Sequence, residues 1–170
     1  MSVRKMVTKD SIGLAARAIV DEMGVDALSM RALASKLGIK APSLYDHVRN
    51  RDEVIALIQA QGLSEFGLGF AAVGPTPREK ISFYREWALR NPRLYPVVFQ
   101  HSLHRDKLPE GLEESVLGLV VQAAGGSHIK ARVFWAQLHG LVDLELHGRL
   151  PADADMAATW ETVIANIESL

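Results

Sequence analysis

The segment SMRALASKLGIKAPSLYDHVRNR, residues 29–51, decides how the rest of the chain is interpreted. Its first half carries apolar side chains at the spacing of one helical face, namely Met30, Leu33, Ala34 and Leu37. Ser29 precedes this run, where a hydroxyl accepts from the first free backbone N–H groups of a helix. Gly38 follows it, where a helix end favours a residue that tolerates positive φ. These signals predict a short helix that ends in a glycine turn.

A second short helix is predicted directly after that turn. Pro42 suits the first turn of a helix, because the N–H that proline lacks has no partner there. Leu44 and Val48 then form a narrow apolar seam, and the side chains of 45–47 fall largely off it. Two such helices with a polar outer face describe a helix-turn-helix unit over residues 29–48. A helical corner in an all-α protein has the same periodicity, so the pattern alone leaves both interpretations open.

The residue identities favour the DNA-binding interpretation. The stretch LSMRALASKLGIKAPSLYDHVRNRDEVI, residues 28–55, closely resembles the DNA-binding segment of the tetracycline-repressor (TetR) family of bacterial transcription regulators. The resemblance rests on the A-x-x-L-G-I turn, the S-L-Y-x-H-V recognition helix and the N-R-x-E-V entry into the next helix. It covers roughly residues 8–66. It implies a helix-turn-helix head that binds operator DNA.

The side chains of this segment indicate how it would contact DNA. Tyr45 and His47 can donate to phosphate oxygens, and Arg51 can neutralise a phosphate at the start of the next helix. The resemblance implies this phosphate role for Tyr45 and Arg51, and it places Arg31 at a position that reaches bases, where it could span guanine O6 and N7. The start of the recognition helix usually enters the major groove. The predicted DNA-binding residues are Ser29, Arg31, Lys40, Ala41, Pro42, Ser43, Tyr45, His47 and Arg51.

Asp46 departs from this pattern. Its carboxylate would repel phosphates unless it accepts from a cytosine amine or pairs with Arg49. The sequence leaves these two possibilities open.

Composition excludes several other kinds of protein. The 170 residues include no cysteine, which rules out disulfides, thiol nucleophiles and cysteine-ligated zinc. No uninterrupted apolar run approaches the roughly 18 residues that span a bilayer, and the N-terminus carries no apolar signal segment, so we expect a cytoplasmic protein. The net charge of −1 divides into +2 for residues 1–53 and −3 for residues 54–170. DNA affinity would therefore rest on placed contacts and on two copies of the head.

The whole chain reads as an all-α protein with two domains. A glycine-rich stretch, 67–74, is the expected boundary between a DNA-binding domain over 1–66 and a ligand-binding and dimerisation domain over 75–170. Helices are expected over about 8–23, 30–37, 42–48, 50–66, 76–91, 93–101 with a break at Pro96, 109–124, 127–147 and 154–170. Residues 101–109 are expected to form a polar loop.

The helix over 127–147 carries the main indication of a partner. Its interior, VFWAQLHGLVDLEL, is apolar on nearly every side, so more than one of its faces must be covered. A homodimer through 127–147 and the last helix, 154–170, explains this most simply. The W-x-x-x-H-G-L sequence at 135–141 also resembles the C-terminal domain of a TetR subgroup named for a Trp-His-Gly signature.

Aromatic residues of the second domain are candidates for a ligand pocket. Such residues could line an apolar pocket between helices for a small apolar ligand, although aromatic side chains at helical spacing more often fill a core. His139 is the polar group deep in the long helix. The candidate ligand-binding residues are Tyr84, Trp87, Phe99, Phe134, Trp135, Leu138 and His139.

No catalytic or metal-binding motif is found in the sequence. It contains no G-x-S-x-G, phosphate-loop, Rossmann or H-E-x-x-H pattern, so we expect no cofactor, no metal and no enzyme. The resemblance implies a repressor that binds a palindromic operator as a homodimer and releases it when a ligand binds. A DNA-binding dimer without a ligand is the alternative, and a small helical enzyme with a hidden site is a more remote one.

Overall fold

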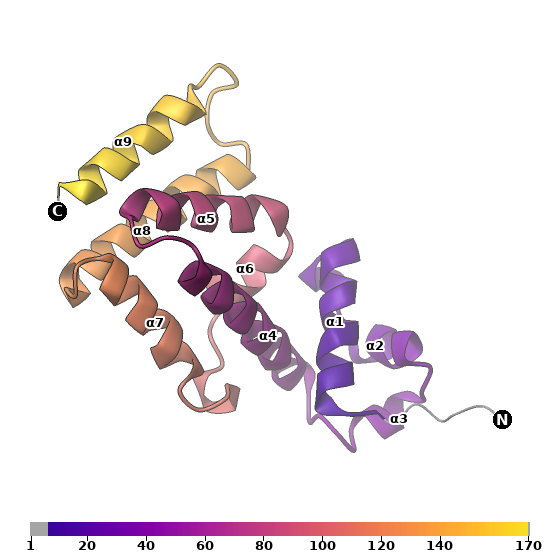
Figure 1. Ribbon diagram of the computed structural model, residues 1–170. Coiled ribbons are helices and arrows are strands. Elements are labelled where there is room, and N and C mark those ends of the chain that lie inside the picture. Colours follow the sequence, from indigo (N-terminus) through magenta and orange to yellow (C-terminus); the bar gives the residue numbers. More distant parts are fainter. Residues whose placement is uncertain (1–6, 170) are drawn as a thin grey trace. The chain divides into compact units, whose positions relative to one another are not determined.

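The computed structural model describes residues 7–169, and within that range the chain is helical with no strand, as predicted (Figure 1). Residues 1–6 of the predicted first domain and Leu170 of the predicted last helix lie outside the described residues. The helices are α1 (Lys9–Met23), α2 (Met30–Leu37), α3 (Ala41–Leu44), α4 (Arg51–Ala72), α5 (Pro77–Arg90), α6 (Leu94–Phe99), α7 (Leu112–Ala123), α8 (His128–Leu146) and α9 (Met156–Glu168), with short 3-10 turns η1 (Val25–Ala27) and η2 (Arg105–Lys107).

The chain forms two compact units. The first contains residues 1–64 and 93–113, and the second contains residues 65–92 and 114–170. This division differs from the expected one, because the segment 93–113 packs with the N-terminal residues. The helix α4 begins in the first unit and ends in the second.

The glycine-rich stretch that was expected to break the chain at 67–74 is instead helical as far as Ala72. Its glycines provide space for neighbouring side chains. A Cβ on Gly67 would lie 3.0 Å from Val116, and one on Gly69 would lie 2.4 Å from the ring of Phe83. The glycines therefore allow close packing along one helix, and they do not mark a boundary loop.

Gly62 provides the same kind of space in the first unit, where a Cβ would lie 2.3 Å from Cγ2 of Val98. We expect Gly62→Ala to lower the free energy of unfolding by about 1–3 kcal/mol, because the added methyl overpacks the contact with α6. Gly118→Ala is the matched control, since a Cβ at this helical glycine meets nothing within 4 Å. It should raise stability by about 0.5–1 kcal/mol through helix propensity. Urea denaturation of both variants tests this, and equal effects would contradict the packing role of Gly62.

Side-chain caps define the helices of the first unit. Thr8 and Ser11 form a reciprocal capping box at the start of α1. The hydroxyl of Ser29 accepts from the N–H of Ala32 at 3.1 Å, and Gly38 ends α2 at φ 71°, both as predicted. The core beneath the helix-turn-helix is formed by Ile12, Ile19, Leu28, Leu33, Leu44, Val48 and Val54, all buried.

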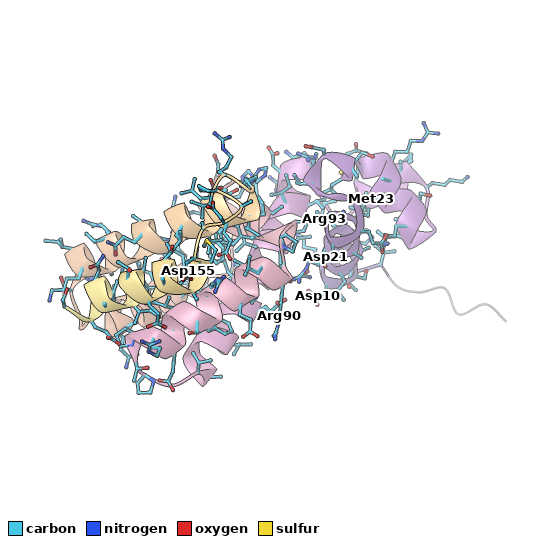
Figure 2. All side chains as sticks on the ribbon, turned by 90° about the horizontal axis from the view of Figure 1, so that it is seen from above. Asp10, Asp21, Met23, Arg90, Arg93 and Asp155 are labelled. Carbon is cyan, nitrogen blue, oxygen red and sulfur yellow. The ribbon has the colours of Figure 1, made fainter. Side chains whose placement is uncertain are left out.

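The segment 93–113 is fixed to the first unit by polar contacts. Arg93 lies beside Asp21 at the end of α1, where its Nη1 donates to the Asp21 carbonyl at 3.0 Å and also to that of Glu22 (Figure 2). Pro96 lies in the first turn of α6 and does not interrupt it, because a proline there lacks only an N–H that would have no helical partner. The polar loop expected over 101–109 contains the turn η2.

In the second unit, α5, α8 and α9 pack against one another (Figure 1). Thr76 and Glu79 form a capping box at the start of α5. The buried Lys80 donates from Nζ to the carbonyls of Phe70 and Val73, at the C-terminal end of α4. A cation at this position satisfies free carbonyls and opposes the negative end of the helix dipole.

One face of α8 is buried in its own chain and the other is exposed. The buried face holds Ala131, Phe134, Leu138 and Val142. The exposed face presents three large apolar side chains, Ile129 at 73%, Val133 at 42% and Leu144 at 40% exposure. This is the uncovered surface that the sequence led us to expect.

By length and composition alone, α4 could cross a membrane, with a mean hydropathy of 1.3 over its most apolar window. However, 56% of that window is buried inside the protein. Buried side chains from Val54 to Phe70 form part of the cores of both units. We therefore interpret α4 as a core helix.

Candidate functional site

The exposed face of the helix-turn-helix brings several of the predicted DNA-binding residues together. Arg31 on α2, Lys40 before α3, and Pro42 and Ser43 within it are exposed, whereas Ala41 is half-buried. Within residues 7–169, no ion pair or hydrogen bond engages the side chains of Arg31 and Lys40. Their cationic ends are therefore available to bases or phosphates.

Tyr45 lies at the C-terminal end of α3 and is 53% exposed. Its ring is therefore not packed into the core beneath the second helix. The seam residues Leu44 and Val48 are buried instead. The hydroxyl of Tyr45 can therefore reach a ligand in solvent, while the neighbouring His47 is half-buried.

Arg51 has a structural engagement that the sequence did not indicate. Its Nε donates to the carbonyl of Leu28 at 2.8 Å, and its Nη2 donates to the carbonyl of Val25 at 2.8 Å. The guanidinium thus holds the end of η1 against the start of α4, with two of its donor groups engaged by backbone carbonyls. The phosphate contact predicted for Arg51 stays a prediction, and the guanidinium N–H groups outside these two hydrogen bonds could make it.

Arg49 is an exposed cation that was not among the predicted DNA-binding residues. It precedes Asn50, whose side-chain oxygen accepts from the N–H of Glu53 at 3.0 Å and caps α4. No described residue forms an ion pair with the Arg49 guanidinium. Its position beside a helix N-terminus is one where a phosphate is stabilised.

Glu53 organises the start of α4. Its carboxylate accepts from the backbone N–H of Arg49 at 2.8 Å and from Nζ of Lys9 at 2.9 Å. These two contacts, the backbone one first, hold the pKa of Glu53 below its usual value. A groove of about 490 Å³ runs past this cluster and is lined by Lys9, Arg49, Asn50, Glu53, Leu57, Asp106 and Lys107.

The predicted ligand-binding residues divide between the two units. Phe99 lies half-buried in the first unit, against Tyr95 at a ring-centroid distance of 5.5 Å. The others belong to the second unit, where Tyr84, Phe134 and Leu138 are fully buried. In this unit Phe66 is the centre of an aromatic cluster formed by Phe70, Phe83, Tyr84, Trp87 and Trp135. These aromatic side chains therefore contact one another in the interior of the second unit, and their role in ligand binding stays a prediction.

A polar pair lies at one side of this aromatic cluster. The hydroxyl of Tyr84 is 2.8 Å from Nδ1 of His139, and the His139 ring lies 4.6 Å from that of Trp135. Burial lowers the pKa of His139 to about 4, opposed by its hydrogen bond to the Trp135 carbonyl and by the charge of Asp143. The imidazole is therefore neutral at physiological pH.

The lowered pKa of His139 predicts an acid-sensitive second unit. Between pH 6.5 and about 4 the unfolded chain binds a proton at this residue and the folded chain does not. Stability should therefore fall as the pH falls through this window, in total by about 2 kcal/mol after allowing for partial exposure. His139→Gln should remove this part of the pH dependence, whereas the exposed His147→Gln should keep it. Thermal unfolding across the window measures both, and identical profiles would contradict the assignment.

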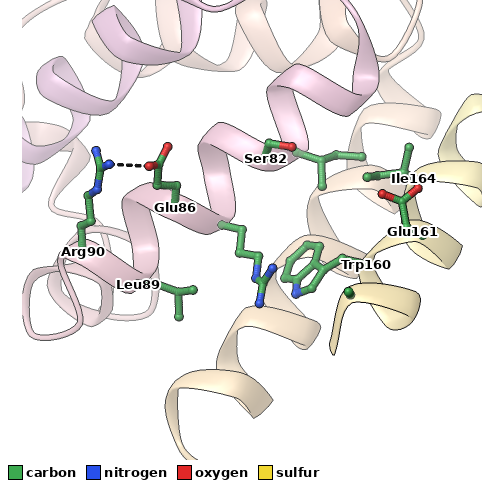
Figure 3. A pocket seen from close by; sticks show the side chains of 10 residues that line it. Ser82, Glu86, Leu89, Arg90, Trp160, Glu161 and Ile164 are labelled. Carbon is green, nitrogen blue, oxygen red and sulfur yellow. Dashed lines mark hydrogen bonds and ion pairs between the residues drawn. The ribbon is translucent and has the colours of Figure 1, made fainter. Parts of the chain in front are cut away.

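A groove of the second unit lies between α5 and α9 (Figure 3). It has a volume of about 580 Å³ and was not predicted. Its lining combines apolar and charged side chains, with Glu86 and Arg90 paired along α5. Arg85 on α5 forms a bidentate ion pair with Glu145 on α8. The Glu145 carboxylate also accepts from Nε1 of Trp160 on α9 at 3.0 Å, so these contacts join the three helices. The lining residues are Ile81, Ser82, Arg85, Glu86, Leu89, Arg90, Ala157, Trp160, Glu161 and Ile164.

Within residues 7–169, no group of three or more histidine, aspartate or glutamate side chains is placed to hold a metal ion.

Two family descriptions match the sequence. Residues 12–64 match "Bacterial regulatory proteins, tetR family", and residues 81–167 match "Tetracyclin repressor-like, C-terminal domain". The second description does not name the Trp-His-Gly subgroup, so that resemblance stays a prediction.

Similar proteins match most of the chain. An HTH-type transcriptional regulator of Mycobacterium tuberculosis is 27% identical over 95% of this chain and 80% of its own length. The HTH-type transcriptional regulator YobS of Bacillus subtilis is 30% identical over 72% of this chain and 66% of its own. The crystal structure of apo ActR from Streptomyces coelicolor is 23% identical, with a TM-score of 0.67 over 96% of this chain and 95% of ActR. ActR in complex with (S)-DNPA gives a TM-score of 0.63.

Proposed function

Because this chain belongs to the tetR family of bacterial regulatory proteins, we propose that it is a ligand-released repressor that binds a palindromic operator as a homodimer. The family and the similar proteins are DNA-binding transcriptional regulators and not enzymes, and the chain is one of them. The exposed face of Arg31, Lys40, Ser43 and Tyr45 carries the operator-binding part of the proposal. Cytoplasmic action, where operator DNA lies, is part of the same proposal.

Two copies of this face would read the two halves of an inverted repeat. Recognition helices about 34–36 Å apart enter successive major grooves on one side of the duplex. The exposed apolar face of α8 is the surface proposed to join the two copies, together with α9. A ligand that binds more tightly to a dimer whose recognition helices are spaced differently weakens operator binding. The operator weakens ligand binding by the same factor.

The structure supports separate roles for the two arginines that follow α3. We expect Arg49→Ala to weaken binding to all duplexes about equally and to reduce the salt dependence by roughly one phosphate contact. Arg51→Ala should instead lower the free energy of unfolding by about 1–3 kcal/mol, because two backbone carbonyls lose a charged donor. Binding at several salt concentrations and urea denaturation measure both quantities. A loss of stability in Arg49→Ala with none in Arg51→Ala would reverse the assignment.

The proposed ligand site is the cluster of Tyr84, Trp135 and His139. A hydroxyl and an imidazole beside aromatic rings provide the few polar groups that orient a mainly apolar ligand. A ligand would have to separate these packed side chains, so it would select a more open state of the second unit. The ActR complex with (S)-DNPA supports ligand binding by a protein of this fold.

Selection of bound sites from a random duplex pool tests the operator part. The proposal predicts an inverted repeat, and no enrichment at low salt would contradict it.

A thermal-shift screen of apolar small molecules tests the ligand part, since a true ligand gives a saturable rise. A shift lost in His139→Ala supports the aromatic cluster, whereas a shift lost only in Leu89→Trp would place the ligand in the α5–α9 groove. The alternative, a DNA-binding dimer without a ligand, predicts enrichment but no saturable shift.

A further inference from the structure

Asp46 is an exposed carboxylate on the face that reads DNA. It lies one helical turn after Pro42 and Ser43, which are also exposed, so the three side chains share one side of the recognition segment. The backbone continues to turn beyond α3, with the N–H groups of His47 and Val48 both donating to the carbonyl of Leu44. The neighbouring Leu44 and Val48 are buried, which fixes Asp46 on the outer side.

The structure favours one of the two possibilities that the sequence left open for this carboxylate. The guanidinium of Arg49 does not pair with Asp46, and within residues 7–169 no hydrogen bond or ion pair engages the Asp46 side chain. The nearby Arg49 contact is made by its backbone, which donates to Glu53. The Asp46 carboxylate therefore approaches DNA with hydrogen-bond acceptors that no other side chain within residues 7–169 engages.

An acceptor-only group discriminates strongly among base edges. In the major groove, cytosine presents an amine donor, whereas guanine presents two acceptors and thymine an acceptor with a methyl group. Adenine has a donor, but with an acceptor beside it. An ionised carboxylate has no hydrogen to offer, so cytosine fits it best. Phosphates repel the same charge, which leaves a base amine as the compensating partner.

We propose that Asp46 is a specificity-determining residue that reads a cytosine N4 amine at one fixed position in each operator half-site. This inference rests on the proposed function and deepens it. Arg31 and Lys40 are donor-only groups suited to guanine, so Asp46 gives the same face the opposite preference. Pro42 and Ser43, on the same side, place the contact within the part of the segment that enters the groove.

The test is site selection with wild-type protein, Asp46→Asn and Asp26→Asn. The last is a matched control, because it removes one exposed carboxylate from the same unit outside the recognition segment. Wild-type protein and Asp26→Asn should select cytosine at one position per half-site. Asp46→Asn should lower the preference for cytosine over thymine there by roughly 5- to 100-fold and leave the other positions unchanged.

Two results would overturn the inference, and they differ in what else they affect. If Asp46→Asn selects the same bases at every position and binds all duplexes more tightly, the carboxylate only repels phosphate and the proposed function stands. If wild-type protein selects no sequence at all, both this inference and the operator-binding proposal fail.

Discussion

Replacing Gln59 with leucine is expected to lower the free energy of unfolding by about 3 kcal/mol or more. This amide is fully buried in α4. Its Nε2 donates to the carbonyls of Val97 and Ser102, both at 3.1 Å, and its Oε1 accepts from the N–H of His104 at 3.2 Å. Leucine would leave these three backbone groups without their partner, and each buried unsatisfied group costs about 1–3 kcal/mol.

The loss of these hydrogen bonds should also loosen the whole segment 93–113, which Gln59 attaches to the first unit. Gln61→Leu is the matched control in the same helix. Its Oε1 is buried without a hydrogen-bond partner among the described residues, so its removal should be neutral or stabilising. Urea denaturation compares the two variants, with proteolysis of the segment 100–111 as a second measure. A Gln59→Leu protein as stable as Gln61→Leu would show that the buried amide does not hold the segment.

Placing a charge on the exposed face of α8 is expected to reduce operator affinity by roughly 100-fold or more. Val133 lies between Ile129 and Leu144 on the face proposed as the dimer interface. Val133→Asp would bury an unpaired carboxylate there on association, which costs about 3–5 kcal/mol. Monomers would then bind half-sites independently and lose the benefit of the second head.

Leu68→Asp is the control for this prediction. Leu68 is a 74% exposed apolar residue on α4 in the same unit, so it receives the same charge outside the proposed interface. It should remain dimeric with its operator affinity unchanged. Size-exclusion chromatography with light scattering measures the dimer, and circular dichroism confirms that the fold is kept. A dimeric Val133→Asp protein with full affinity would place the interface elsewhere.

Local signals in the sequence were sufficient for most helix ends. The predicted cap at Ser29 acts on a backbone group three residues away, so both partners lie in one short stretch. The end of α2 at Gly38 likewise depends only on the positive φ of that residue. The same locality explains why the helix-turn-helix and its exposed face could be predicted.

Features that depend on distant partners were not predictable. From the sequence alone, Gly69 is interpreted as a residue that ends a helix. In the structure it lies within a helix, where the ring of Phe83 packs closely against it. The hydrogen bonds of Arg51 to the carbonyls of Leu28 and Val25 join residues 23 and 26 positions apart, so no local pattern indicates them. Aromatic spacing in the second unit identified residues that come together, such as Tyr84 and His139, but it could not distinguish a filled core from an open pocket.

The mass of the complex with a selected operator tests the central claim of a dimeric sequence reader most directly. Sedimentation of a labelled inverted-repeat duplex with saturating protein should give one duplex carrying two chains, formed in a single cooperative step. The same duplex with one half-site scrambled should bind far more weakly. A stable complex of one chain per duplex, insensitive to the second half-site, would contradict the account.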